Sequence, residues 1–491
     1  ISQRLTATLI LVTLVATFGS SFQYGYNVAS VNSPSPFMKD FYNSTNIERV
    51  GSPLEDAFLT LLWSLTVSLY PLGGFFGSLL VGPLVSKLGR KGTLLFNNIF
   101  SIIPAILMGT SVVAKTFEVI IASRLFVGVC AGLSSNVVPM YVGEMSPKNL
   151  RGAIGIMPQL MITVGILMAQ IFGIRYILGN TEGWPILLAL TGIPAVLELA
   201  FLPFFPESPR YTLLHKGNED KAKKALQRLR GWEDVDSEIK EMYQEDQSEK
   251  AEGQLSVRNL CTFRPLRWQL ISIIVMNMGQ QLSGINAVYY YADSIYKSAG
   301  VKEETIQYVT VATGSVNVLM TLAAVSYVCM IFKIISFMIN IIKNLISGCL
   351  NQFILLKNSL ELHLGYKSDF PLFAIISLYS IVPGPIPYVI TTEMFRQASR
   401  PAAFMIAGSV HWLSNFIIGL IFEFLMNGLG AYCFILFAAI CLATFIFIYI
   451  VVPETKGKTF LEVSQLMAKR NGLEETVDSK EFQDLNPPSN E

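Results

Sequence analysis

Twelve apolar runs, each about as long as a helix that crosses a membrane, constrain this chain more than any other feature of its sequence. A helix needs about 20 consecutive apolar residues to span the hydrocarbon core of a bilayer. The runs are continuously apolar rather than alternating, so helices are expected and not strands. The expected spans, of which the ninth has the weakest pattern, lie near residues 6–28, 58–80, 93–112, 117–138, 150–174, 184–203, 267–290, 305–328, 331–353, 370–391, 401–425 and 430–451.

The sequence therefore predicts an all-α membrane protein with twelve transmembrane helices, whose surroundings are a lipid bilayer. Only 14% of the 491 residues are charged, against roughly 25% in a soluble domain. The formal net charge is +1, so no nucleic-acid partner is expected. Six cysteines are scattered without a Cys-x-x-Cys pair, and three histidines suggest no metal cluster. No nucleophile–base pattern is visible, so we expect no catalytic residue, no metal, no cofactor and no enzyme activity.

The distribution of lysine and arginine predicts the orientation of the chain in the membrane. The short basic segments and the polar stretch 206–266 all fall on one side of a twelve-span topology, which is then cytoplasmic, as are both termini. The loop 29–57 falls on the opposite side and contains Asn43-Ser44-Thr45, so we expect Asn43 to be glycosylated, although such triplets also occur by chance. The first span carries no convincing cleavage signal and is expected to be retained. The basic segments are 86–92, 146–152, 394–401 and 453–460.

Two motifs recur at nearly the same offset and predict two related six-helix halves. "GEMSPKNLRGA" (143–153) matches "TEMFRQASRPA" (392–402), and "PESPRY" (206–211) matches "PETKGK" (453–458). Helix-end motifs also look alike by chance, but two matches at one offset favour a repeat, and repeated halves are a transporter plan. The expected domains are a six-helix half (1–205), a cytoplasmic helical linker (206–266), a second six-helix half (267–452) and a cytoplasmic tail (453–491).

One segment departs from this repeat. The repeat predicts a basic turn near residue 333, but Ile, Lys, Asn and Phe make up 18 of the 28 residues from 331 to 358. This stretch has either diverged or been translated from the wrong DNA. We therefore assign no functional residue between 329 and 369.

Several motifs together resemble the sugar porters of the major facilitator superfamily, in particular the animal facilitative hexose transporters. The matching pieces are "GRK" (89–91), "PESPRY", "QQLSGINAVYYY" (280–291), "PGPIP" (383–387) and "PETKGKTF" (453–460). Other stretches, such as "FGSSFQYGYN" and "SVHWLSNF", look most like the fructose carriers. The resemblance covers nearly the whole chain outside 329–369. It implies the major facilitator fold, a small-molecule sugar as substrate, a plasma-membrane location and a monomer.

The stretch "GQQLSGINAVYYY" places many hydrogen-bonding groups and no charge inside an apolar span. A sugar presents neutral hydroxyls, so neutral amides and hydroxyls match it without burying an ion. The alternative is that these groups join neighbouring helices. The resemblance implies sugar contacts at Gln159, Gln280, Gln281, Asn286 and Asn317, and we add Tyr24, Tyr290, His411 and Trp412 from similar depths.

Three residues bear on which sugar is carried. His411 precedes Trp412 where glucose carriers usually show Asn, which resembles the fructose carriers. Tyr379 and Tyr388 do not follow the fructose pattern, so the choice between fructose, glucose and another neutral polyol stays open.

Asn27 stands where proton-coupled sugar porters carry Asp, and an amide does not titrate, so downhill uniport is expected. Coupling through Glu144 or Glu393 is the alternative, and a sugar sensor that does not transport is a further one.

Charged residues at the expected cytoplasmic helix ends predict a gate. A charge at the membrane centre costs about 2.5–3.5 kcal/mol on insertion scales, so these residues belong at an interface. Pairs between the halves are expected to hold the cytoplasmic side closed, each worth about 0–1 kcal/mol. The alternative is that these residues only set the orientation of the chain in the membrane, which would explain the arginines but not the glutamates. The expected gate residues are Arg90, Arg124, Glu144, Arg151, Glu207, Glu393, Arg400 and Glu454.

Overall fold

A computed structural model describes the two bundles of the protein, the linker between them and short parts of the remainder. The described residues are 6–147, 150, 154–252, 257–262, 266–298, 302–330, 390–391, 394–395, 399–429, 432–453 and 466–467. All the regular structure in this part of the chain is helical, which confirms the predicted fold class. The tenth expected span lies outside the described residues apart from 390–391, and the ninth lies outside them entirely.

The helices before residue 205 form the N-terminal bundle. Its first span is continuous through α1 (Ala7–Ala16), the π-helical segment η1 (Thr17–Ser21) and α2 (Phe22–Ala29). A separate helix, α3 (Ser35–Val50), occupies the expected loop 29–57. The remaining members are α4 (Asp56–Asn97), α5 (Ile99–Thr110), α6 (Glu118–Met145), α8 (Met157–Phe172), α9 (Trp184–Ala189) and α10 (Gly192–Phe201).

The helices after residue 266 form the C-terminal bundle, and four shorter helices join the two bundles. The C-terminal bundle contains α15 (Arg267–Leu282), α16 (Ile285–Ser298), α17 (Glu303–Met330), α21 (Arg400–Leu429) and α22 (Cys433–Val451). The linker contains α11 (Pro209–Leu214), α12 (Glu219–Arg230), α13 (Asp236–Glu252) and α14 (Val257–Thr262). Within the described residues, five helical stretches are long and apolar enough to cross a membrane.

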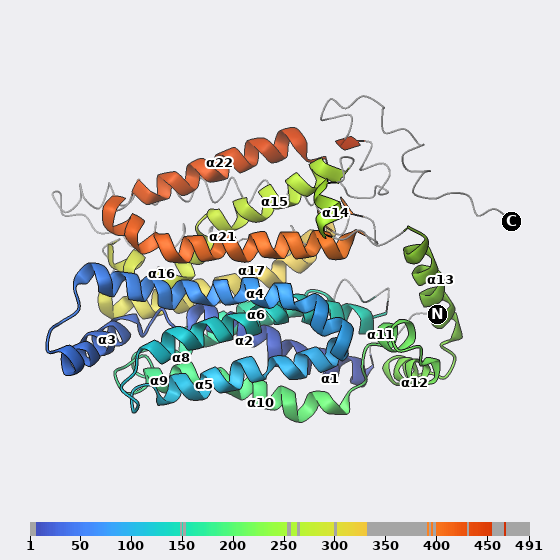
Figure 1. Ribbon diagram of the computed structural model, residues 1–491, viewed down its shortest axis with the longest axis horizontal. Coiled ribbons are helices and arrows are strands. Elements are labelled where there is room, and N and C mark those ends of the chain that lie inside the picture. The colour runs from blue at the N-terminus through green and yellow to red at the C-terminus, as the bar shows by residue number, and fades with distance from the viewer. Residues whose placement is uncertain are drawn as a thin grey trace.

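The two bundles lie side by side with their long helices running in nearly the same direction (Figure 1). Helix α4 packs on α6 within its own bundle and on α21 of the other, and α8 packs on both α2 and α17. These pairings define the seam between the bundles. Helix α3 lies at one end of the molecule, and α11–α13 lie at the other (Figure 1). We call these the α3 end and the linker end.

The seventh expected span is broken in the middle of its polar stretch. Helix α15 ends at Leu282, and Gly284 adopts a left-handed conformation with φ of +85° before α16 begins. Only glycine occupies this region without strain. The sequence predicts one continuous span here, whereas the structure shows a break, across which the Asn286 amide donates to the Gln281 oxygen.

Candidate functional site

Aromatic rings fill the seam at the middle of the molecule. Trp412 of α21 is almost fully buried, and its ring centroid lies 5.3 Å from that of Tyr24 and 6.2 Å from that of Tyr70. A Cβ atom on Gly74 of α4 would lie 2.3 Å from the Trp412 ring, so the close approach of α4 and α21 requires glycine there. The predicted pair Tyr24 and Trp412 therefore meets across the two bundles.

A neutral hydrogen-bond network lies beside this aromatic contact. The Gln281 amide nitrogen lies 3.0 Å from Nδ1 of His411, and the Asn286 amide donates to the Gln281 oxygen. Because an amide nitrogen donates, Nδ1 accepts in this arrangement, and the neutral ring then carries its proton on Nε2. Three of the predicted sugar contacts, from α15, α16 and α21, thus form one network without a formal charge.

The other predicted sugar contacts are less closely grouped. Asn317 of α17 donates to the Tyr289 hydroxyl at 2.7 Å. Gln280 is buried on α15, and Tyr290 is buried in the same apolar cluster as Trp412. Gln159 is half-buried on α8, in the opposite bundle. The structure thus places the predicted sugar contacts on helices of both bundles. Hydrogen bonds join Gln281, Asn286 and His411, and ring contacts join Tyr24 and Trp412.

Arg124 corrects one prediction, because it does not belong to the group at the cytoplasmic helix ends. It is completely buried on α6, 20 residues before Glu144, which is about 30 Å along a helix. Its Nη1 donates to the Asn27 carbonyl at 3.0 Å and its Nε to the Thr66 carbonyl at 3.2 Å. The guanidinium also lies 4.6 Å from the centre of the Tyr70 ring. Two backbone carbonyls and a π face contact this charge, while its Nη2 has no hydrogen-bond partner among the described residues. Sequence alone does not reveal such partners.

Asn27 itself has an uncharged partner. Its amide donates to the Thr191 hydroxyl at 2.6 Å and to the Gln23 carbonyl at 2.8 Å. The Asn27 side chain is therefore engaged with neutral groups, beside a buried arginine that its backbone also contacts.

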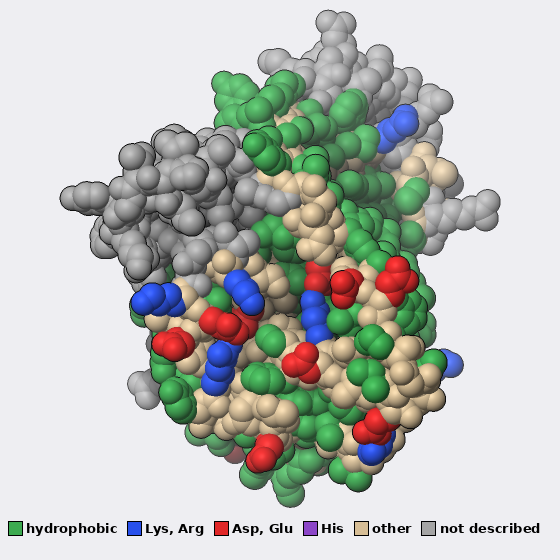
Figure 2. All heavy atoms as spheres, turned by 90° about the vertical axis from the view of Figure 1, so that its left-hand side faces the viewer, with side chains coloured by type: hydrophobic (Ala, Val, Ile, Leu, Met, Phe, Trp, Pro, Cys, Tyr) green, Lys and Arg blue, Asp and Glu red, His purple; other side chains and the backbone are tan. Residues whose placement is uncertain are grey.

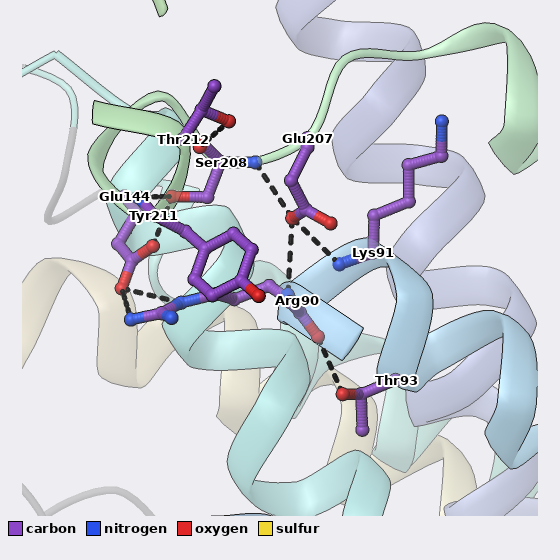
Figure 3. Close-up of polar contacts among 9 residues, drawn as sticks. Arg90, Lys91, Thr93, Glu144, Glu207, Ser208, Tyr211 and Thr212 are labelled. Carbon is purple, nitrogen blue, oxygen red and sulfur yellow. Dashed lines mark hydrogen bonds and ion pairs between the residues drawn. The ribbon is translucent and has the colours of Figure 1, made fainter. Parts of the chain in front are cut away.

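Three of the predicted gate residues form a compact cluster at the linker end (Figure 3). The guanidinium of Arg90 binds Glu144 with Nη2–Oε1 at 2.8 Å and Nε–Oε1 at 3.1 Å. Ser208 donates to the other oxygen of Glu144, and the Tyr211 ring lies 5.2 Å from the Arg90 guanidinium. Helices α4, α6 and α11 are thereby tied together.

Glu207 binds backbone rather than a cation. Its Oε1 accepts from the backbone N–H groups of Arg90 at 3.1 Å, Lys91 at 3.0 Å and Ser208 at 2.9 Å. Gly89, with φ of +81°, turns α4 so that these N–H groups face the carboxylate, and a Cβ there would lie 2.6 Å from Glu207. Burial lowers the pKa of Lys91, while the Glu207 charge opposes that shift. Glu207 therefore caps the kink in α4.

The described members of the gate all belong to the N-terminal bundle or the linker. Arg151, Glu393 and Glu454 lie outside the described residues, as does the side chain of Arg400, the first residue of α21. Whether the cluster joins both halves therefore stays a prediction.

Polar links between the bundles occur at the α3 end, where the sequence did not predict them. Lys39 of α3 binds Glu423 of α21 at 2.5 Å. Arg175, which follows α8, binds Glu303 of α17 at 3.0 Å. Figure 2 shows acidic and basic side chains side by side on this face. The partners of the first pair are 384 residues apart, a separation at which sequence gives no pairing signal.

Asn43 is half-buried on α3, and its side-chain oxygen accepts from the Leu54 N–H at 2.9 Å. Within the described residues, no three His, Cys, Asp or Glu side chains are grouped to hold a metal ion.

Two bundles of membrane-length helices that meet at a polar and aromatic centre, with the buried Arg124 beside it, have the plan of a membrane transporter. Solved structures of similar fold include the E. coli xylose transporter XylE in a partially occluded inward-open conformation. It matches with a TM-score of 0.77 at 21% identity, over 92% of this chain and 100% of that one. The proton:xylose symporter XylE bound to 6-bromo-6-deoxy-D-glucose matches with a TM-score of 0.75 at 22% identity, over 94% and 99% of the two chains.

The chain belongs to the sugar (and other) transporter family, whose model matches residues 12–467. The chain is 57% identical over 486 residues to the sheep (Ovis aries) "Solute carrier family 2, facilitated glucose transporter member 5", covering 99% of this chain and 97% of the relative. The human member 5 is 58% identical over 489 residues, covering 99% and 98%. The human member 7 is 53% identical over 496 residues, covering 99% and 95%. These relatives are named as transporters rather than enzymes, which agrees with the sequence-based expectation.

Proposed function

We propose that this protein is a uniporter for a hexose, with fructose as the first candidate, and that it works by alternating access across the plasma membrane. The observation that carries the proposal is the network of the neutral amides Gln281 and Asn286 with His411 in the C-terminal bundle, next to the Trp412 ring that meets Tyr24 across the seam. Hexose hydroxyls both donate and accept, so amides and a neutral imidazole match them without a desolvated charge.

The sugar is expected to bind between this network and the aromatic pair Tyr24 and Trp412. Apolar ring faces pack against the C–H face of a pyranose or furanose, while amides bind its hydroxyls. The further residues Gln159, Gln280, Tyr290 and Asn317 are proposed to complete the site when the bundles rock about the seam.

Uniport is supported by Asn27, whose side chain does not titrate and whose amide is bound to Thr191. Among the described residues, the neighbouring Arg124 donates to two backbone carbonyls and pairs with no carboxylate. Neither residue therefore forms an ion pair there that a proton would break. Transport then follows the sugar gradient alone.

We further propose that the linker end is cytoplasmic, as are both termini, and that Asn43 on the opposite face carries a glycan. The Arg90–Glu144–Glu207 cluster, together with the predicted partners Arg151, Glu393, Arg400 and Glu454, would close the cytoplasmic side in one state. The contacts Lys39–Glu423 and Arg175–Glu303 would close the outer side in the other. The chain is proposed to function as a monomer built from the domains 1–205, 206–266, 267–452 and 453–491.

Reconstitution tests the proposal. Purified protein in liposomes should take up labelled fructose faster than empty liposomes, and unlabelled fructose should compete. Labelled glucose in parallel tests the second candidate, which the names of the relatives favour. Gln281→Leu, with a side chain of similar size, should abolish most of the uptake, whereas Gln227→Leu on linker helix α12 serves as the control. Binding of sugar without uptake would identify a sensor instead.

A further inference from the structure

A small polar cavity lies in the seam between the bundles at the α3 end, away from the Gln281 network. Its free volume is about 10 Å³, which is room for one water-sized group. The N-terminal bundle and the turn after α2 contribute Asn32, Ser33 and Gln170 to its polar lining, and the C-terminal bundle contributes Asp293, Gln307 and Thr310.

The cavity holds an unsatisfied acceptor. The side chain of Gln170 is 93% buried, since only 7% is exposed, and its Oε1 accepts no hydrogen bond from the described residues. A buried amide oxygen without a donor costs about 1–3 kcal/mol. A Cβ on Gly314 would lie 1.9 Å from this oxygen, so the glycine leaves the space that the oxygen occupies.

The cavity also straddles a contact between the bundles. The backbone N–H of Asp293 donates to the Asn32 side-chain oxygen at 3.2 Å, and the Gln307 oxygen accepts from the Arg175 N–H at 2.8 Å. Because the Asp293 link uses its backbone, its carboxylate is not needed for that contact. When the bundles separate at this end, the same groups line the way to the centre.

We propose that this cavity is an outer subsite of the sugar path, where Gln170 and Asp293 accept hydrogen bonds from the hydroxyls of an arriving hexose. The inference rests on the proposed function. A water molecule has two O–H groups and bridges two acceptors, and two adjacent sugar hydroxyls present the same pair of donors. Water fills the subsite when the bundles are closed at the α3 end, and the sugar displaces it when they are open.

Uptake kinetics of the full chain in liposomes of known orientation test this subsite. Gln170→Leu removes the acceptor at nearly constant size, and Asp293→Asn replaces the carboxyl acceptor while keeping the backbone contact. Each should raise the half-saturating fructose concentration for uptake from the α3 side roughly two- to tenfold, the effect of one net hydrogen bond. The half-saturating concentration for efflux should not change, because sugar leaving the linker side does not start from this subsite.

Glu304→Gln is the matched control for Asp293→Asn. It removes one negative charge at the same end from an exposed side chain that does not line the cavity, and it should leave both concentrations unchanged. Unchanged uptake values in both cavity variants, at normal protein amounts, would show that the cavity holds only water and overturn the proposal. Equal rises in the half-saturating concentrations for uptake and for efflux would also overturn it, because they indicate general damage to the protein. Absence of sugar uptake by the unmodified protein would instead overturn the proposed function.

Discussion

Breaking the Lys39–Glu423 pair should open the α3 end, and the effect should depend on which of the two residues is replaced. The Glu423 side chain is 13% exposed and the Lys39 side chain 27% exposed. Lys39→Met leaves a mostly buried carboxylate without its cation, whereas Glu423→Gln leaves an ammonium that is 5.3 Å from the centre of the Trp63 ring and reaches water. The lysine substitution should therefore be the more disruptive.

The magnitude follows from burial. Exposed pairs contribute about 0–1 kcal/mol, and removal of one partner from a buried pair costs about 3–5 kcal/mol. For this intermediate case we expect Lys39→Met to destabilise the state closed at the α3 end by about 2 kcal/mol, and Glu423→Gln to destabilise it by about 0.5–1 kcal/mol. At 1.4 kcal/mol per factor of ten, these correspond to roughly 30-fold and two- to fivefold shifts toward the state open at the α3 end.

A cysteine at Ala29 reports this opening, because Ala29 is only 4% exposed and lines the seam cavity. Its reaction with a membrane-impermeant thiol reagent from the α3 side should accelerate in the order Glu423→Gln, then Lys39→Met. A cysteine at Val50, which is 70% exposed, should react equally in all backgrounds. The double variant should react more slowly than Lys39→Met, because no unpaired charge remains. Equal labelling of Ala29→Cys in all backgrounds would refute the role of this pair.

Substitutions at three further positions test other contacts. Gly74→Ala places a methyl group against the Trp412 ring and should cost about 1–3 kcal/mol of stability, seen as a lower melting temperature; an unchanged melting temperature would mean that the helices separate freely. Glu207→Ala leaves three backbone N–H groups without their acceptor and should lower stability by about 2–3 kcal/mol, whereas Glu207→Gln should recover part of it; equal stability of both variants would contradict the capping role. Glu198→Gln should leave transport intact, because the carboxyl of Glu198 accepts from a neutral hydroxyl, at 2.8 Å and 3.0 Å from its oxygens, and loss of transport would show that a carboxyl is required.

The long, uniform features of the fold could be predicted from the sequence. Apolar runs placed the first span at 6–28 and the eleventh at 401–425, close to the observed 7–29 and 400–429. The break at Gly284 could not be predicted, because glycine lowers the cost of a left-handed residue without requiring one. Helix α3 lies where the sequence predicts a loop, because its apolar stripe, formed by Phe37, Met38, Phe41 and Tyr42, is too short to stand out from a polar segment.

The candidate site was predictable in its residue types and not in its pairings. The neutral amides of 279–291 pointed to the centre, but the Gln281–His411 contact joins residues 130 apart. The position of Arg124 could not be predicted, because a charge in a span is expected at an interface, and the carbonyls of Asn27 and Thr66 to which it donates come from other helices. Pairings of this kind depend on how helices pack, which periodicity does not encode.

The central claim is that sugar crosses at an uncharged site and moves only down its own gradient. Its most direct test is the final level of labelled fructose in liposomes that contain the protein, with and without an imposed proton gradient. We predict that internal and external concentrations become equal in both conditions, and that the proton gradient does not change the plateau. Accumulation above the external concentration under the gradient, or no protein-dependent uptake in either condition, would contradict the account.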